Sequence, residues 1–248
     1  EGGWGAVAAH EAASVSLSRC AASGTRTAFF ATGDARLRIV ACAVRAAGGP
    51  GLREGVRLEE RARAGVWGLS VEGYPVGFLL RGSSRARLRG CRTRDNGLGV
   101  FAEQSARMLL SRSRISGSRT HGLWVKDAAA ARVAGSVLSG NSHNGAYVSE
   151  GGRLSLERVK MRASGNGIRV IDSEFAATDS DLSGVRALYL DLRRQYNGHN
   201  NGQIAAVLEG TEDRPGLAAY GWPPRSVFKY IKVLLDHHLI EKTRQGGI

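Results

Sequence analysis

The sequence has few prolines, cysteines and aromatic residues, and each shortage narrows the possible architectures. Its 248 residues include 5 Pro and 3 Cys, and aromatic residues make up 6%. The odd number and wide spacing of Cys20, Cys42 and Cys91 argue against both a disulfide framework and a C-x-x-C metal site. No stretch is apolar and long enough to cross a membrane, and no signal peptide is visible. Glycine is abundant instead, with 34 residues, which favours short strands joined by short turns over long helices.

Charge is unevenly distributed along the chain. Residues 1–190 contain 27 Lys and Arg against 16 Asp and Glu, whereas residues 191–248 contain 8 against 6. The first part has only the lysines Lys126 and Lys160, and the much shorter second part has three. This change in composition predicts a boundary near residue 190. The net charge of +13 suits an acidic partner, either a polyanionic sugar or a nucleic acid, although arginines on solvated turns explain it equally well.

A polar turn returns every 22 to 25 residues in the middle of the chain. The segments "ISGSRTHG", "LSGNSHNG" and "ASGNG" each end in a glycine, and Gly97, Gly122, Gly145 and Gly167 give intervals of 25, 23 and 22 residues. Each glycine precedes a short alternating strand, "LGVFAE", "LWVKD", "AYVSE" or "IRVID", and a second short strand follows. Looser copies of the pattern cover residues 4–24, 27–49 and 55–75.

The repeat predicts a stack of coils. Alternation with a period of two indicates strands that are buried on one face, and no amphipathic helix interrupts the pattern to make a helical crossover. Each repeat is therefore predicted to pair in parallel with the next, so that equivalent side chains stack about 4.8 Å apart. Three columns are predicted: Asn96, His121, Asn144 and Asn166; Val100, Val125, Val148 and Val170; and Cys20, Cys42, Cys91, Ser113, Ser136 and Val159. The third column makes the cysteines core packing rather than redox groups.

The repeats and the "SGN…NG" turns resemble the right-handed parallel β-helix family, the pectate-lyase-like superfamily, over residues 3–185. The resemblance implies a fold that hosts polysaccharide lyases, hydrolases and epimerases as well as modules without catalytic activity. The predicted fold class is all-β, a right-handed parallel β-helix solenoid with a small C-terminal α+β winged-helix-like segment. The predicted domains are 1–188 for the β-helix and 189–248 for the second segment.

Acidic residues also recur with the repeat. Asp127, Glu150 and Asp172 each lie five residues after the repeating glycine. The resemblance implies that lyases of this fold bind substrate and calcium with acids from adjacent coils, so these three residues are candidate catalytic and calcium-binding groups, and Lys126 or Arg169 is the candidate that neutralises or deprotonates a uronate. Acids that cap backbone amides at turns, or face water beside arginines, are the competing explanation. No paired-acid hydrolase motif is present, which favours lyase or epimerase chemistry over hydrolysis.

Four further residues are candidate ligand-binding groups on the same coils. His121 and His143 lie 22 residues apart near one corner and suit either metal binding or acid–base work, although no third metal ligand is evident. Stacking within the asparagine column explains them as well. Trp124 and Tyr147 are predicted to share one outward position with Gly99 and Arg169, and the two rings suit stacking against a sugar, or shielding of a neighbouring loop.

The last segment has a different pattern. Residues 223–237 begin with two prolines and carry apolar residues on one face, which predicts a helix. Together with "YNGHNNG" and "LIEKTRQGG", this helix resembles the winged helix-turn-helix of phage- and replication-associated proteins, over residues 195–248. The resemblance implies contact with duplex DNA by the helix and the start of the wing. The candidate DNA-binding residues are Arg225, Lys229, Lys232, Thr243, Arg244 and Gln245. A helix that only caps the open end of the coils is the competing explanation.

These patterns leave three functions open. The first is binding, or lyase- or epimerase-type processing, of an anionic polysaccharide on the lateral surface of the solenoid, with calcium as the only candidate cofactor. The second is DNA binding through the C-terminal segment, with the β-helix as a scaffold, and the third is a purely structural or adhesive repeat. The compartment follows from the choice: extracellular or periplasmic for the first function, cytoplasmic for the second.

Overall fold

The computed structural model describes residues 5–48, 51–162, 164–184, 188–190, 210–211 and 214–215. The chain divides into two units, Glu1–Leu190 and Asp191–Ile248. In the second unit the described residues form one short antiparallel pair, β26 (Gly210–Thr211) with β27 (Arg214–Pro215). The predicted helix 223–237 and all six candidate DNA-binding residues lie outside the described residues. None of the described residues belongs to a helix that could cross a membrane.

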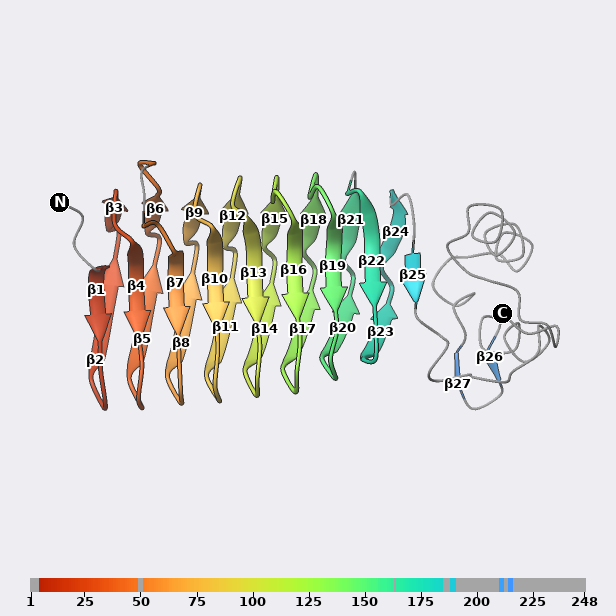
Figure 1. The fold of residues 1–248 in the computed structure, drawn as a ribbon, viewed down its shortest axis with the longest axis horizontal. Helices are drawn as coiled ribbons and strands as arrows, with labels where there is room; N and C mark the ends of the chain where they lie inside the picture. Colours follow the sequence, from red (N-terminus) through yellow and green to blue (C-terminus); the bar gives the residue numbers. More distant parts are fainter. Residues whose placement is uncertain are drawn as a thin grey trace. The chain divides into compact units, whose positions relative to one another are not determined.

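The first unit is a parallel β-solenoid of about eight coils with three strands in each coil (Figure 1). Its strands form three sheets, and each strand pairs in parallel with the equivalent strand of the next coil. Sheet A contains β1 (Gly5–Ala9), β4 (Thr27–Ala31), β7 (Glu54–Leu58), β10 (Val76–Leu80), β13 (Leu98–Ala102), β16 (His121–Val125), β19 (Asn144–Val148), β22 (Asn166–Val170) and β25 (Leu188–Leu190). Sheet B contains β2 (Ser14–Ser18), β5 (Arg36–Val40), β8 (Arg63–Trp67), β11 (Arg85–Arg89), β14 (Arg107–Ser111), β17 (Ala130–Ala134), β20 (Arg153–Glu157) and β23 (Glu174–Thr178). Sheet C contains β3 (Ala21–Ser23), β6 (Ala43–Arg45), β9 (Ser70–Glu72), β12 (Arg92–Arg94), β15 (Arg114–Ser116), β18 (Val137–Ser139), β21 (Lys160–Arg162) and β24 (Asp181–Gly184).

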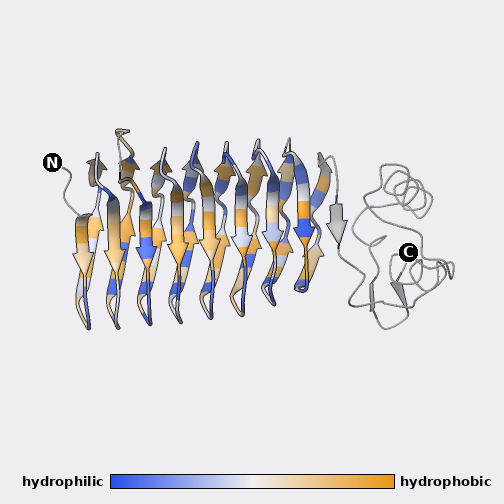
Figure 2. Cartoon of the chain, in the orientation of Figure 1, coloured by the Kyte–Doolittle hydropathy of each residue, from blue (hydrophilic) through white to orange (hydrophobic). Residues whose placement is uncertain are grey.

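The core lies inside the coils because the strands alternate. In β11, Ala86 and Leu88 are buried, whereas Arg85, Arg87 and Arg89 are exposed. The same alternation recurs along sheet B, so that one face of each strand fills the interior and the other meets solvent. Figure 2 shows apolar bands along the strands of every coil, with hydrophilic bands between them, for example in β7 and β22. The prediction of an all-β solenoid of stacked coils is confirmed.

The register confirms part of the predicted columns and corrects the rest. Asn144 pairs with both His121 and Asn166, and Val148 pairs with Val125 and Val170, as predicted. Val125, however, pairs with Ala102, so the placement of Val100 in that column is wrong. The coil from Ala102 to Val125 therefore has 23 residues, not the 25 that separate Gly97 from Gly122. The buried side chains set the register here, and the similarity of the two turns does not.

Asn96 is also misplaced in the predicted asparagine column. It is fully buried at the corner between sheets C and A, where its Oδ1 accepts a hydrogen bond from the Tyr74 amide at 2.9 Å and its Nδ2 donates to the Val71 carbonyl at 3.2 Å. Asn141 acts similarly in a later coil, since its Oδ1 accepts from the Ser118 amide at 3.1 Å. These buried amides satisfy turn backbone that no strand partner reaches.

The cysteine column is confirmed, with Leu69 inserted between Cys42 and Cys91. In this column the sulfur or hydroxyl of one coil accepts a hydrogen bond from the backbone amide of the coil before it. Cys42 Sγ accepts from Cys20 at 3.3 Å, and Ser113 Oγ accepts from Cys91 at 3.0 Å. All three are free thiols, and the core-packing prediction holds for Cys42 and Cys91, which are buried. It is wrong for Cys20, which is exposed in the first coil. Burial raises the pKa of the Cys91 thiol, which keeps it protonated in this structural role.

Candidate functional site

The outer face of sheet A carries a row of aromatic rings, which we call the aromatic row: Phe101, Trp124 and Tyr147. Register places the three residues at one outward position of β13, β16 and β19. Phe101 and Trp124 stack with ring centroids 4.7 Å apart, and Trp124 and Tyr147 stack at 5.4 Å. The Arg169 guanidinium lies over Tyr147, 5.6 Å from the ring centroid.

This stacking limits what the aromatic row can offer to a ligand. Both faces of Trp124 are covered by its neighbours, and its Nε1 donates a hydrogen bond to Ser149 Oγ at 3.1 Å. A sugar that stacks on an aromatic ring needs an exposed ring face, whereas here mainly the ring edges point outward. The rings therefore stabilise sheet A by packing on one another, and the prediction that Trp124 and Tyr147 bind a sugar stays a prediction.

His121 begins β16 beside the aromatic row and is half-buried. Its Nδ1 lies 2.8 Å from Asn144 Nδ2, and Asn144 Oδ1 accepts a hydrogen bond from Asn166 Nδ2 at 3.2 Å. Because an amide nitrogen only donates, His121 Nδ1 must accept, which leaves the ring neutral with its proton on Nε2. The asparagine column thus fixes the tautomer of a histidine.

Burial, with smaller contributions from the positive charges of His143 and Arg169, lowers the pKa of His121 to about 4. The His143 ring lies 5.8 Å away and is exposed. No group of three His, Cys, Asp or Glu residues able to hold a metal ion occurs in the part of the chain that the structure describes. A neutral His121 at neutral pH is a hydrogen-bond donor through Nε2 and a weak base.

The depressed pKa of His121 predicts a pH dependence of stability. The unfolded chain binds the proton near pH 6.5 and the folded chain only near pH 4, so folding stability decreases as the pH falls from about 6.5 to about 4. We expect the midpoint of thermal unfolding of the wild type to fall across this window and that of His121→Asn to fall less, because asparagine continues the amide column without a titrating group. His143→Asn is the control and should keep most of the wild-type slope. Equal slopes for His121→Asn and the wild type would contradict the assignment.

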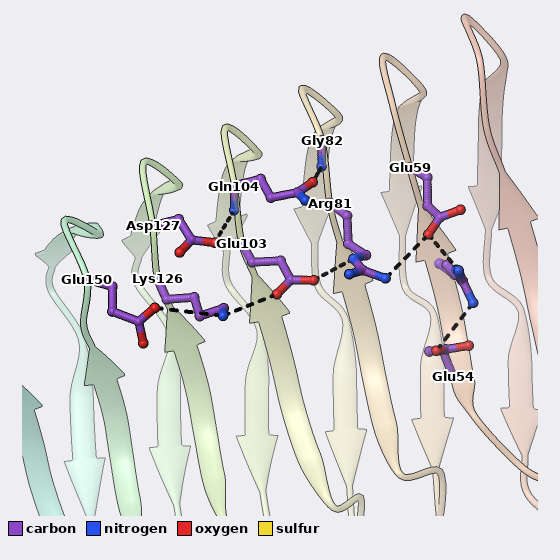
Figure 3. Close-up of polar contacts among 10 residues, drawn as sticks. Glu54, Glu59, Arg81, Gly82, Glu103, Gln104, Lys126, Asp127 and Glu150 are labelled. Atoms are coloured by element: carbon purple, nitrogen blue, oxygen red, sulfur yellow. Dashed lines mark hydrogen bonds and ion pairs between the residues drawn. The ribbon is translucent and has the colours of Figure 1, made fainter.

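A row of alternating charges runs along the ends of the sheet A strands (Figure 3), where Glu103 and Lys126 lie two residues after Phe101 and Trp124. We call Glu59, Arg81, Glu103 and Lys126 the charge ladder. Glu103 accepts from Arg81 Nε at 2.5 Å and lies 3.7 Å from Lys126 Nζ, which is also 3.9 Å from Glu150. Glu59 lies 3.8 Å from Arg81 Nη1 of the next coil and also binds Arg57 of its own coil at 2.6 Å. Each charge has partners on neighbouring coils, so Lys126, a predicted catalytic base, is held in the ladder and shares its charge between two carboxylates.

The predicted acid cluster lies one residue beyond the ladder, at the corner between sheets A and B. Register places Asp127, Glu150 and Asp172 at equivalent positions of three successive coils, and each has a positive φ, of 56°, 55° and 49°. Asp127 Oδ2 accepts a hydrogen bond from the Gln104 backbone amide at 3.0 Å. The Gln104 side chain acts in the same way on the coil before it: its Oε1 accepts a hydrogen bond from the Gly82 backbone amide at 2.7 Å.

For Asp127 this geometry favours the capping role that the sequence offered as the alternative, and Glu150 lies beside Lys126. At a corner residue with a positive φ, the backbone amide finds no hydrogen-bond acceptor on a neighbouring strand. A side-chain oxygen from the next coil accepts its hydrogen bond instead. The three acids stack, but they form no metal-binding group among the described residues. The calcium site and the catalytic roles of Asp127, Glu150 and Asp172 therefore remain predictions without a geometric observation behind them.

The strongest concentration of one charge lies elsewhere, on the outer face of sheet B. Seven exposed arginines on β5, β8, β11 and β14 form what we call the arginine face: Arg36, Arg38, Arg63, Arg85, Arg87, Arg89 and Arg107. Four of these arginines occupy one register column in consecutive coils, since Arg63 pairs with Arg36 and Arg85, and Arg85 pairs with Arg107. Like charges at directly paired positions destabilise a sheet, so the arrangement costs folding free energy.

Few acids neutralise the arginine face. The nearby carboxylate of Asp34 is held by Arg61, with contacts of 2.7 and 2.9 Å, and this hydrogen bonding keeps the Asp34 pKa below its usual range. Within the described residues, no guanidinium of Arg63, Arg85 or Arg107 forms an ion pair or a hydrogen bond to a side chain. Arg38 lies over the half-exposed Trp67 ring, 5.6 Å from its centroid.

Comparison with known proteins agrees with this geometry. Residues 53–181, just over half of the chain, match the family model described as the right-handed β-helix region. The chain belongs to the right-handed β-helix family. No curated protein and no solved structure matches it. At the level of this family the fold is consistent with polysaccharide binding or processing, whereas the winged-helix resemblance has no support in the comparison.

The arginine face of this β-helix protein was not predicted from the sequence, although the signal is present in it. The segments "RLRIV" and "RARLR" place arginine at every second residue, which on a strand puts them on one side. Arg63 begins the strand between them. The excess of arginine is visible in the composition, but the composition assigns it to no surface. The arginines form one surface patch only because the register aligns these strands in adjacent coils.

Proposed function

We propose that this protein binds an anionic polysaccharide along the outer face of sheet B. The observation that carries the proposal is the column of four arginines, Arg36, Arg63, Arg85 and Arg107, in directly paired positions. The spacing between neighbouring strands is about 4.8 Å. A linear polymer with one carboxylate or sulfate per sugar, lying along the solenoid axis, presents its charges at a comparable interval. Binding relieves the repulsion within the column and releases the counterions held by the polymer.

The arginine face suits a polysaccharide better than a nucleic acid. Proteins that bind single strands place several aromatic rings between their cations so that the bases stack on them. The arginine face has one aromatic residue, Trp67, which Arg38 partly covers. Duplex readers usually insert a helix or a β-ribbon into a groove, whereas the arginines here lie on the face of a sheet. DNA binding through the second unit remains a separate prediction.

Charge neutralisation of two paired arginines tests the proposal. We expect Arg63→Gln/Arg85→Gln to weaken binding to polygalacturonate or a sulfated polysaccharide by on the order of tenfold at low salt, because two ion pairs are lost. The dependence of affinity on salt concentration should become less steep by about one to two counterions. The measurement is affinity electrophoresis or titration at several salt concentrations, with neutral glucans as negative ligands.

Arg92→Gln/Arg114→Gln is the matched control, because these arginines are also paired in register and exposed, but on sheet C. It removes the same charge and should retain most of the wild-type affinity. Equal losses in both double variants would mean that net charge, not the arginine face, determines binding, and that outcome overturns the proposal. Tighter binding of single-stranded DNA than of every polysaccharide would also overturn it. Growth of absorbance from unsaturated products on the same polymers tests the separate lyase prediction.

A further inference from the structure

The arginine column ends at a shallow recess of about 480 Å³ on the outer face of sheet B. The recess lies over β14, β17, β20 and β23, where the outward side chains become small. Ala130, Ser155 and Ala176 are the small outward residues among those that line it, and Arg107, Arg132 and Arg153 are the cations. The recess exists because Ala130 occupies the column position between Arg107 and Arg153.

The lining combines cations, one acid and a hydroxyl with the apolar residues Met108, Leu154 and Phe175. Arg153 Nε lies 3.3 Å from Glu174 Oε1, with both side chains more than half exposed. Arg132 is engaged by Glu157 at 2.7 Å, whereas Arg107 forms no side-chain hydrogen bond or ion pair among the described residues. A recess of this kind offers cations to one anionic group and the Glu174 carboxylate and Ser155 hydroxyl to sugar hydroxyls.

We infer that this recess is a subsite for a single sugar unit that bears a carboxylate or sulfate, and that it sets the position of the polymer along sheet B. The inference rests on the proposed function and adds a defined binding position to it. Arg107 and Arg153 hold the anionic group, and Glu174 exchanges part of its pairing with Arg153 for a hydroxyl of the sugar. The ring lies over Ala130, where only a methyl group stands above the backbone. The exposed arginines of earlier coils bind the rest of the chain through charge alone.

A variant that fills the floor of the recess tests the inference without changing charge. We expect Ala130→Leu to lower the affinity for a short oligogalacturonate, of three or four sugars, by on the order of tenfold, while the affinity for long polygalacturonate falls much less because the arginine face still binds it. Ala134→Leu is the matched control, since Ala134 is also half-exposed on β17 and lies outside the recess. Thermal unfolding of both variants checks that they fold equally well.

The outcomes separate the inference from the proposed function. Equal affinity of the wild type and Ala130→Leu for the short oligomer would overturn the subsite, even if Arg63→Gln/Arg85→Gln still lost affinity for the polymer. Loss of short-oligomer binding in Ala134→Leu as well would also overturn it, because the effect would then not come from the recess. If neither the polymer nor the oligomer binds the wild type, the proposed function itself fails.

Discussion

Gly99→Ala is expected to lower the free energy of unfolding by about 3 kcal/mol, because the added methyl group has no space. A Cβ at Gly99 would lie 2.4 Å from the Gly122 carbonyl oxygen and 2.5 Å from Ile115 Cγ2. The oxygen belongs to the backbone of the next coil and cannot move without separating the two coils. The same contact recurs along sheet A, since a Cβ at Gly77 would meet the Gly99 carbonyl at 2.4 Å. The predicted loss corresponds to a fall of about 10 °C in the unfolding temperature.

Ala28→Gly is the matched control for this variant. Register places Ala28 opposite Gly55, at the position of sheet A that glycine occupies in the later coils. It is fully buried, and there the chain accommodates a Cβ. Removing it should cost only about 1 kcal/mol, from chain entropy and lost packing. The measurement is chemical denaturation. If Gly99→Ala lowers the free energy of unfolding less than Ala28→Gly does, the close contact between coils is not the reason for glycine at this position.

Trp124→Ala is expected to separate stability from ligand binding. It removes the ring between Phe101 and Tyr147 and leaves the buried Ser149 hydroxyl without its donor, so we expect a loss of about 2–4 kcal/mol in unfolding free energy. Its affinity for the polysaccharide should stay within about twofold of the wild type, because the aromatic row lies on sheet A and the arginine face on sheet B. The measurements are denaturant titration and affinity electrophoresis below the unfolding temperature.

Trp67→Ala is the comparison on sheet B. Trp67 is 39% exposed and contacts Arg38, so its removal should cost little stability and should weaken polysaccharide binding more than Trp124→Ala does. A folded Trp124→Ala protein that had lost most of its affinity would move the binding surface to sheet A. That result would restore the sugar-stacking role that the sequence predicts for Trp124 and Tyr147.

The sequence-based predictions succeeded where the pattern repeats without change and failed where two patterns compete. The 22- and 23-residue intervals after Gly122 are regular, and the pairings among His121, Asn144 and Asn166 follow from them. Before Gly122, the segment "DNGLG" contains two glycines, and the one preceded by asparagine matches the later turns in chemistry. The structure pairs Gly99 with Gly122 instead, because this choice puts Val100 and Leu123 in the interior together.

For the candidate site, too, the sequence predicted some features and missed others. Sequence spacing brought Trp124, Tyr147 and Arg169 into one outward column, which is confirmed, but it also placed Gly99 there, which is wrong because Phe101 pairs with Trp124. Spacing could not show that the rings cover one another, that Lys126 lies between Glu103 and Glu150, or that a neighbouring amide fixes the His121 tautomer. These facts depend on rotamers and on contacts across coils, and a residue's position in the repeat does not specify either.

The sequence by itself determined that the first three-quarters of the chain form stacked coils, because strand alternation and a constant repeat length leave no other economical way to bury the apolar face. It also determined which way most side chains point. The tertiary structure decided which residues become neighbours on the surface, because a shift of one or two residues in a single coil realigns every column that crosses it. The arginine face exists only through that alignment: arginines that lie 22 to 27 residues apart in the chain become adjacent across the strands of sheet B.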